Sequence, residues 1–448
     1  MNPQGVSELH SWLTQAGLAG KSETMLLDGF CQRALDAGLP IARAIIVIDT
    51  LHPIHEGRAF SWRHQAGRAQ TELIEYGPTS EGKWAETWRR SVMFHLLETG
   101  KSLFRVRFHA AETADFPTIA QMREEGMSDV IAMITRFPRS GAIGEMDALY
   151  SYWATDRPHG FDDAHVAAIT DLMPMLALAV KCVSLARIAG TLVETYLGRD
   201  PGRRVLKGLI HRGVAEKISA VLWYSDLRGF TGITDHSAPE QIIPLLNDYA
   251  EAVIASIYGC GGDVLKLIGD GTLAIFTAAK AAAACSSAIA GYDVLQERVG
   301  RLNERRARDD LPITHVYLGL HIGEVFYGNI GSDERLDFTV VGPAVNEVAR
   351  IAAMCRSVER DVLLSQAFAR AAASERRRIV SVGRYALRGV ERPQELFTLD
   401  PFSIAARVGY TEPGRAPYGR KKDRGPRAIR FSGSKEPRTQ QIRRTDRC

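Results

Sequence analysis

Apolar and polar residues alternate along the first part of the chain in a pattern that mixes strands with helices. Short runs rich in Ile, Val and aromatic residues predict strands, and stretches with apolar residues three or four positions apart predict helices. Strands are expected over 41–48, 103–108, 128–135 and 146–153, and helices over 84–99 and 118–125. This order predicts an α/β module with a central antiparallel sheet over residues 1–186.

A long apolar helix is expected to close this module. The segment GFDDAHVAAITDLMPMLALAV has an acidic start, and its apolar residues then recur three or four positions apart. These residues are Val166, Ile169, Met173, Leu176, Val180 and Val183. The spacing favours equally a seam that pairs two chains and a helix packed on the sheet of its own domain. Pro174 has no backbone N–H to continue the helix, so a kink is predicted there.

The second region, residues 216–400, has a different order of elements. Residues 187–215 precede it and are interrupted by Gly and Pro, which is typical of a linker. Strands are expected over 220–225, 264–267, 272–276, 314–322 and 324–327, with a further strand that ends at Val341, and helices over 239–257, 278–299 and 343–355. The β-α-β-β-α-β core predicts a ferredoxin-like or palm arrangement, and the whole chain is expected to be α+β.

Composition and charge change the picture mainly at the C-terminal end. The 448 residues exceed one ordinary domain, which agrees with two regions. The net charge is +4, but residues 411–448 hold 12 Lys and Arg against 4 Asp and Glu, so the rest of the chain is mildly acidic. A basic, disordered tail is expected over 404–448, and the body lacks the charge pattern of a specific nucleic-acid-binding protein.

Cysteines and apolar runs bear on the compartment. The six cysteines are scattered without a CxxC pair, which argues against a zinc site and a disulfide framework. No apolar run approaches the roughly 20 residues that span a membrane, and the N-terminal residues lack the apolar core of a signal peptide. These observations predict a cytoplasmic protein with reduced thiols and no transmembrane segment.

Two aspartates stand at the ends of strand-like runs in the second region. Asp226 lies in YSDLRGFTGIT, and Asp270 lies in the tight turn of LKLIGDGTLAIF. An unpaired carboxylate is costly to bury, and a divalent cation compensates for that cost. Hard oxygen ligands suit Mg²⁺ or Mn²⁺ that carries a polyphosphate, and adjacent strands would bring the two acids close enough to share two metal ions.

Several separated motifs in the second region agree in order and spacing with one family. Because of SDLRGFT, GGDVLKLIGDGTLAIF and DFTVVGPAVNEVARI, residues 216–400 resemble the class III nucleotidyl cyclase catalytic domain. The resemblance implies a head-to-tail homodimer whose active sites are shared between the chains. The closing helix of the first module resembles the last helix of GAF-type domains, which implies a sensory module that receives a small-molecule or protein signal.

The cyclase resemblance implies roles for residues at the metal and the phosphates. Asp226 and Asp270, with the backbone at Leu227, would bind two Mg²⁺ or Mn²⁺ ions. The turn that continues through Gly229 and Phe230 would present backbone N–H groups to phosphate oxygens.

It likewise implies roles for residues at the base and the ribose. Lys266 and Thr339 would recognise adenine, with Thr339 marking the threonine subgroup of the family. Asn346 and Arg350, four residues apart on one face of the predicted helix, would orient the ribose and stabilise the transition state. Arg388, in Leu-Arg-Gly-Val, stands where the family often carries a lysine that reaches the triphosphate.

The implied reaction is attack of the ribose 3′-hydroxyl of ATP on the α-phosphorus, which gives cyclic AMP and pyrophosphate. Lysine cannot accept a hydrogen bond, so Lys266 favours ATP over GTP. Two alternatives are weighed against this enzyme. A catalytically silent homologue that acts as a nucleotide-binding regulatory partner would usually lack one of the motif residues, and a diguanylate cyclase would carry a GG(D/E)EF turn where LIGDG stands.

Two features of the first module are explained better by ordinary structure than by a site. His52 and His55 in LHPIHEGRAF are candidates for a metal or haem, but loop histidines far more often lie at a plain surface. Trp84, Trp88 and Phe94 fit core packing better than a ligand site.

Overall fold

The computed structural model describes residues 3–65, 67–108, 116–138, 143–144, 146–388 and 393–400. These residues build two sheets with helices around them, so the α+β prediction is confirmed. The predicted basic tail over 404–448 lies outside the described residues.

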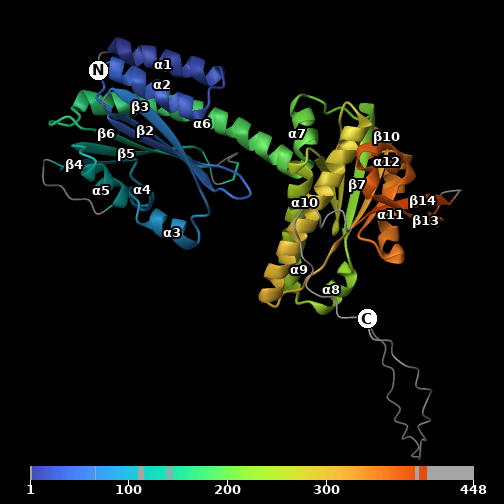
Figure 1. Ribbon diagram of the computed structural model, residues 1–448. Helices are drawn as coiled ribbons and strands as arrows, with labels where there is room; N and C mark the ends of the chain where they lie inside the picture. Colours follow the sequence, from blue (N-terminus) through green and yellow to red (C-terminus); the bar gives the residue numbers. More distant parts are fainter. Residues whose placement is uncertain are drawn as a thin grey trace, which may run out of the picture. The chain divides into compact units, whose positions relative to one another are not determined.

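The first module is built on six antiparallel strands in the order β3-β2-β1-β6-β5-β4 (Figure 1). The strands are β1 (Arg43–Asp49), β2 (Gly57–Gln65), β3 (Arg68–Tyr76), β4 (Leu103–Arg107), β5 (Asp129–Arg136) and β6 (Ala148–Thr155). The helices are α1 (Pro3–Leu18), α2 (Glu23–Asp36), α3 (Gly82–Arg89), α4 (Val92–Thr99), α5 (Pro117–Glu124) and α6 (Asp163–Leu197). Buried residues of α1, α2 and α6 pack on one face of the sheet, and those of α4 and α5 pack on the other.

Strand β1 shows why the sheet is covered on both sides. Ala44, Ile46 and Ile48 pack in the cluster of α1, α2 and α6, whereas Ile45 and Val47 pack against the cluster of α4 and α5. A strand that is buried on both faces has apolar residues at consecutive positions. This continuous apolar run is the signal from which β1 was predicted.

The edges of the module differ from the prediction. The helix expected over 84–99 is two helices: α3 ends with Arg90 as its C-cap, and Ser91 caps the start of α4, its Oγ accepting from the backbone N of Phe94 at 3.1 Å. Helices α1 and α2 and strands β2 and β3 were not predicted. Strand β3 is largely exposed, so its sequence lacks the alternation of apolar and polar residues by which a half-buried strand is predicted. The resemblance to GAF-type domains stays a prediction.

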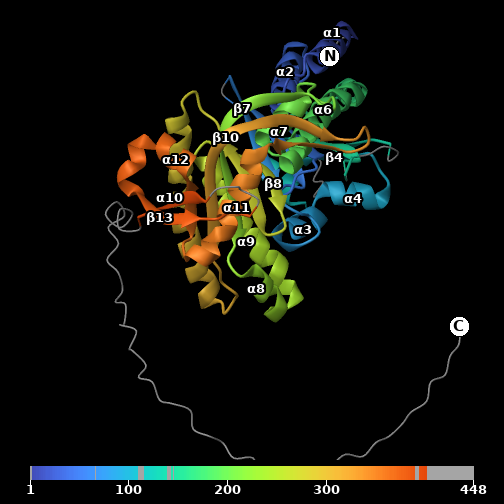
Figure 2. The ribbon, with the colours of Figure 1, turned by 90° about the vertical axis from the view of Figure 1, so that its right-hand side faces the viewer.

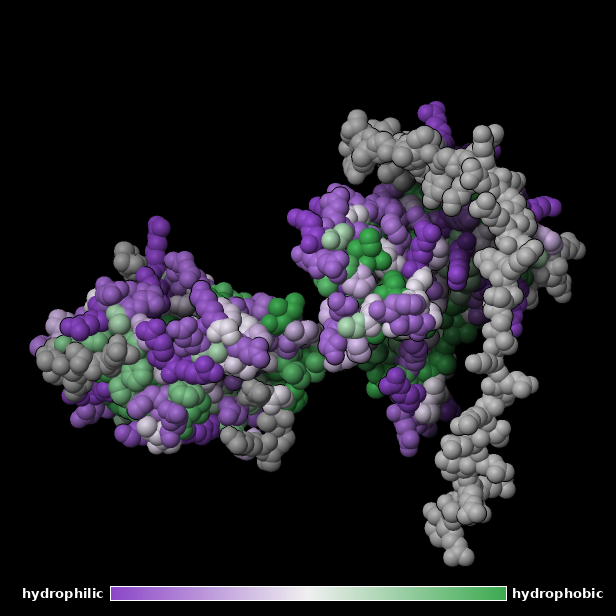
Figure 3. All heavy atoms as spheres, turned by 90° about the horizontal axis from the view of Figure 1, so that it is seen from below, coloured by the Kyte–Doolittle hydropathy of each residue, from purple (hydrophilic) through white to green (hydrophobic). Residues whose placement is uncertain are grey.

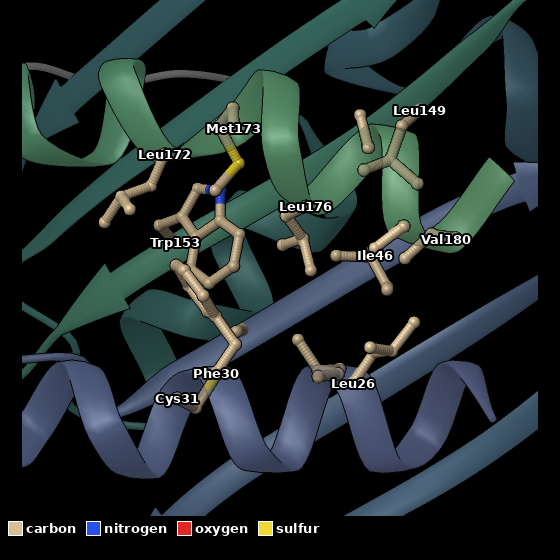
Figure 4. Packing of buried hydrophobic residues seen from close by; sticks show 14 of the residues in the cluster. Leu26, Phe30, Cys31, Ile46, Leu149, Trp153, Leu172, Met173, Leu176 and Val180 are labelled. Carbon is tan, nitrogen blue, oxygen red and sulfur yellow. The ribbon is translucent and has the colours of Figure 1, made fainter. Parts of the chain in front are cut away.

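The seam expected on the closing helix is a core face of the module. Ile169, Met173, Leu176 and Val180 are at most 1% exposed. Figure 4 shows Leu176 and Val180 of α6 facing Ile46 of β1, with α2 beyond them. These side chains are occupied within one chain, so the structure favours the second interpretation of the apolar spacing.

Helix α6 is also longer than expected. It begins at an N-cap, Asp162, whose carboxylate accepts from the backbone N of His165 at 2.7 Å, and it continues to Leu197. The prediction of a linker over 187–215 was therefore wrong: α6 occupies its first part, and α7 (Arg199–Leu206) follows.

By length and composition alone, α6 can cross a membrane, with a mean hydropathy of 1.8 over its most apolar window, of which 44% is buried. The sequence prediction rested only on uninterrupted apolar runs, and polar residues interrupt the apolar sequence of this helix. The buried core helix of a soluble domain meets the same criterion, and the buried face of α6 packs in the module. On the visible face in Figure 3, hydrophobic residues are scattered among hydrophilic ones.

The second sheet has the strand order β13-β14-β12-β10-β7-β9-β8, with β11 paired to β10. Its strands are β7 (Ala215–Leu227), β8 (Asp263–Ile268), β9 (Gly271–Phe276), β10 (Val316–Gly331), β11 (Leu336–Val341), β12 (Val362–Ser365), β13 (Ile379–Tyr385) and β14 (Gln394–Leu399). Its helices are α8 (Phe230–His236), α9 (Pro239–Gly259), α10 (Ala281–Arg308), α11 (Pro343–Val358) and α12 (Gln366–Ala371). The order β7-α9-β8-β9-α10-β10 confirms the predicted β-α-β-β-α-β core, and the strands expected over 314–322 and 324–327 are one strand.

Helices α9 and α10 lie side by side on this sheet (Figures 1 and 2), and α11 packs on its other face. The reason for the close approach of α11 is Gly319 of β10, where a Cβ atom would come within 2.7 Å of the carbonyl oxygen of Val348. The absence of a side chain at Gly319 lets the helix backbone approach the strand.

Contacts at the end of α6 join it to the second sheet. Gly198, with a φ of +91°, lies against the carbonyl oxygen of Val264 on β8, which a Cβ would approach to 2.3 Å. Next along the chain, Asp200 accepts from the hydroxyl of Tyr327 at 2.9 Å and from Nε of Arg204 at 2.7 Å. A side chain at Gly198 would clash with backbone, so this junction requires glycine.

Candidate active site

Asp226 and Asp270 meet where β7 ends beside the β8–β9 hairpin. Ser225 pairs with Thr272, so Asp226 lies next to the hairpin turn. The turn is tight because Gly269 takes a φ of +63°. A carboxylate oxygen of Asp270 then accepts from the backbone N of Leu227 at 3.3 Å. The structure thus brings together the three residues predicted at the metal.

Burial and the carboxyl group of Asp270 both change the pKa of Asp226. Partial burial, with the neighbouring Asp270 carboxyl, raises the pKa of Asp226 to about 6. Burial and both acids also raise the pKa of Tyr224. A divalent cation would remove this repulsion, and paired carboxylate oxygens fit Mg²⁺ or Mn²⁺. Within the described residues no group of three or more His, Cys, Asp or Glu is found here, so further ligands would be backbone carbonyls, water or phosphate oxygens.

We expect Asp226→Asn to stabilise the metal-free protein, and more at about pH 8 than at about pH 5. Between about pH 4 and about 6 folded Asp226 holds a proton that the unfolded chain has lost, so its contribution to stability falls as pH rises through that window and stays lower above it. Thermal unfolding in a chelator checks this, with Asp309→Asn, an exposed acid, as the control. An equal gain at both pH values would contradict the explanation.

Lys266 has an ionic partner that the sequence did not reveal. Its ammonium pairs with the carboxylate of Asp337 on β11. Both side chains are more than a third exposed, so the pair is accessible to solvent. Thr339 lies two residues beyond Asp337 on β11, and residues two apart share a face of a strand. Lys266, Asp337 and Thr339 therefore belong to one surface made by β8 and β11.

Asn346 and Arg350 lie on α11, which begins at Pro343 after Gly342. They line a cavity with Val340, Val341, Gly342, Pro343, Val345 and Glu347. Asn346 is exposed and Arg350 is half-buried. The residues lining this cavity include neither Asp226 nor Asp270. Within one chain, the metal pair therefore does not share the cavity that the Asn–Arg pair lines.

A polar contact under α11 was also missed by sequence reasoning. His321 of β10 is buried, and its Nδ1 lies 2.9 Å from Oγ of Ser365 and 3.6 Å from a carboxylate oxygen of Glu347. Burial lowers the pKa of His321. Glu347 follows Asn346 directly, so this contact fixes the first turns of the helix that carries Asn346 and Arg350.

The remaining predicted residues lie at chain turns. Gly229 takes a φ of +71° as the N-cap of α8, and Phe230 is its first residue. Arg388 is exposed beyond β13. The Gly389 and Val390 that complete its motif lie outside the described residues.

A comparison with known families matches residues 214–401 to the adenylate and guanylate cyclase catalytic domain. The match spans both carboxylates, the β8–β11 surface and α11. Residues 214–401 are a class III nucleotidyl cyclase catalytic domain.

Relatives of the cyclase domain include named enzymes. An adenylate cyclase of Anabaena cylindrica is 30% identical over 165 residues, which are 36% of this chain and 32% of that protein. Adenylate cyclase 1 of Rhizobium meliloti is 26% identical over 222 residues, 48% of this chain and 33% of that protein. The crystal structure of the adenylyl cyclase CyaB from P. aeruginosa is 22% identical, with a TM-score of 0.39, and the match covers 42% of this chain and 95% of that one. The chain spans about a third of the length of these two curated relatives.

Proposed function

We propose that the chain is an adenylyl cyclase that converts ATP to 3′,5′-cyclic AMP and pyrophosphate as a head-to-tail homodimer. The observation that carries this proposal is the pair Asp226 and Asp270, held at adjacent strand ends within a cyclase domain. The named relatives of that domain include adenylate cyclases, which supports the choice of reaction.

The absence of the metal pair from the cavity of the Asn–Arg pair supports an active site shared between two chains. Because the cavity beside Asn346 and Arg350 includes neither aspartate, one chain would supply Asp226 and Asp270 and its partner would supply the Asn–Arg pair. Divalent ions bound at the aspartates would lower the pKa of the ribose 3′-hydroxyl and neutralise charge on the triphosphate.

Each remaining group has a task that suits its position. The exposed amide of Asn346 would hold the ribose, and the guanidinium of Arg350, one helical turn away, would stabilise charge that develops on the phosphate. Lys266 would donate to the adenine ring and Thr339 would accept from its amino group. Asp337 would hold the Lys266 ammonium in place along the β8–β11 surface.

We further propose that the first module regulates this output. Its closing helix ends at Gly198, against the strand that carries Lys266. Structural change in the module would therefore reach the cyclase domain through this junction.

The direct test is an assay of the purified full chain with Mn²⁺ and either ATP or GTP. We expect cyclic AMP from ATP and at least about tenfold less cyclic GMP from GTP, since a site built on base hydrogen bonds rejects the wrong base. No product from either nucleotide, with ATP still bound, would instead identify a catalytically silent homologue.

We expect Lys266→Glu to lower the preference for ATP over GTP by about tenfold or more, because a carboxylate accepts from guanine and repels Asp337. The ratio of kcat/KM for the two nucleotides measures this preference. Lys280→Glu, at the start of α10, is the matched control and should leave the ratio unchanged. An unchanged ratio in Lys266→Glu would remove this lysine from base selection.

A further inference from the structure

The first module contains a cavity of about 520 Å³ on the face of the sheet opposite α6. It lies between the sheet and the helices α3, α4 and α5, whose residues contribute to its lining. Strand β1 supplies Arg43, Ile45 and Val47 to the lining, while its alternate residues pack toward α6. The volume falls within the range of pockets that hold small organic ligands, about 300–1,000 Å³.

The walls of the cavity are mainly apolar and aromatic. Trp88 of α3 meets Tyr150 of β6 edge to face, with ring centroids 5.5 Å apart, and Tyr76 lies 6.0 Å from Trp84. All four rings line the cavity, and Trp84 is 37% exposed. The sequence predicted Trp84 and Trp88 as core residues, but they border this cavity. Such rings present faces and edges for packing against another planar group.

The polar part of the lining contains two arginines in an unusual arrangement. Arg43 of β1 and Arg63 of β2 are directly opposite each other in the sheet, where like charges are destabilising. Both depend on one acid, Glu125, with an Arg43 Nη1 to Oε2 distance of 3.0 Å and an Arg63 Nη2 to Oε1 distance of 2.8 Å. Glu125 itself does not line the cavity; the acid Glu72 does, and it is exposed, accepts from Gln70 and also attracts Arg43 electrostatically.

Arg43 is not fully satisfied by these contacts. It is 8% exposed, and its Nε–H has no hydrogen-bond partner among the described residues. A buried donor without a partner is costly, because nothing compensates for the water that it loses on burial. Two guanidinium groups share the single carboxylate of Glu125, so the Nε–H of Arg43 is left to donate to a further acceptor, and a carboxylate makes the strongest hydrogen bond with such a donor.

We propose that this cavity binds a small aromatic carboxylate. Its ring would pack among Trp88, Tyr76 and Tyr150, and its carboxylate would accept from Arg43 and Arg63. The inference does not depend on the nucleotide site, because none of the cyclase-domain residues that the structure describes lines the cavity.

The test is isothermal titration calorimetry on the full chain with two matched probes, 1-naphthoate and its neutral counterpart 1-naphthalenemethanol. We expect naphthoate to bind about tenfold more tightly, because charge-assisted hydrogen bonds exceed neutral ones. Equal affinities, or no binding of naphthoate, would overturn the proposal.

Three variants locate the binding. Arg63→Gln should abolish the preference for naphthoate, whereas Arg68→Gln, an exposed arginine on the same hairpin that does not line the cavity, should preserve it. Ala59→Phe should fill the cavity and eliminate binding of both probes. Circular dichroism establishes that each variant folds. A folded Ala59→Phe protein that still binds naphthoate, or a preference that persists in Arg63→Gln, would place the ligand elsewhere and refute the assignment.

Discussion

Replacing Asp270 by Ala is expected to lower cyclic AMP formation by about three orders of magnitude. The carboxylate is half of the acid pair that β7 and the β8–β9 hairpin bring together. Its loss leaves Asp226 without the partner needed to hold two divalent ions. The side chain also accepts from Leu227, so a stability loss of about 1 kcal/mol is expected and must be measured separately.

The matched control is Asp333→Ala, whose side chain is 89% exposed and lies in the loop between β10 and β11. It should retain activity. Full activity in a folded Asp270→Ala protein would show that the hairpin aspartate does not hold the catalytic metal.

Mixing two inactive variants tests whether the site is shared. Asp270→Ala damages the metal surface and Arg350→Ala damages the α11 surface. In a head-to-tail dimer of one chain of each kind, one site carries both changes and the other carries neither. Random pairing should therefore restore about a quarter of the wild-type activity. Failure to recover activity, with mixed dimers present, would mean that each chain builds its own site.

Leu176→Glu is expected to unfold the first module, with a loss of about 4 kcal/mol or more. The side chain is fully buried on α6, facing β1 and α2, and a carboxylate there would have no partner (Figure 4). Thermal unfolding should show the module melting early, while the cyclase domain, which has core clusters of its own, melts as before.

Leu178→Glu, two residues away on the same helix, is the control, because Leu178 is 53% exposed. It should unfold like the wild type. If Leu176→Glu kept its melting temperature and instead lost dimer mass in light scattering, the intermolecular seam would be restored as the better interpretation.

Part of the cyclase domain was predictable because its signals are local. Asp226 and Asp270 stand at strand ends next to tight turns, so the apolar runs indicate them, whereas the roles of Asn346 and Arg350, one helical turn apart, came from the resemblance to the cyclase family. The partner of Lys266 was not predictable, because Asp337 reaches it only when β8 and β11 come together in three dimensions.

The first module shows a different limit. An apolar stripe three or four residues apart is the same whether a helix packs on its own sheet or on another chain, so the role of Leu176 could not be decided from spacing. Likewise, tryptophan is a residue type that is often found in cores, and only the arrangement of α3 over the sheet shows that Trp84 and Trp88 border a cavity.

The glycine at the end of α6 has a consequence for the kinetics of any regulation. Gly198 touches the backbone of Val264, two residues before Lys266, and the strand is irregular between these two positions. A displacement of α6 would thus reach Lys266, the residue that we propose recognises adenine, before it reaches the aspartates at the far end of the hairpin. Control of this kind would change the KM for ATP more than kcat, so the enzyme would respond to its signal most strongly when ATP is scarce.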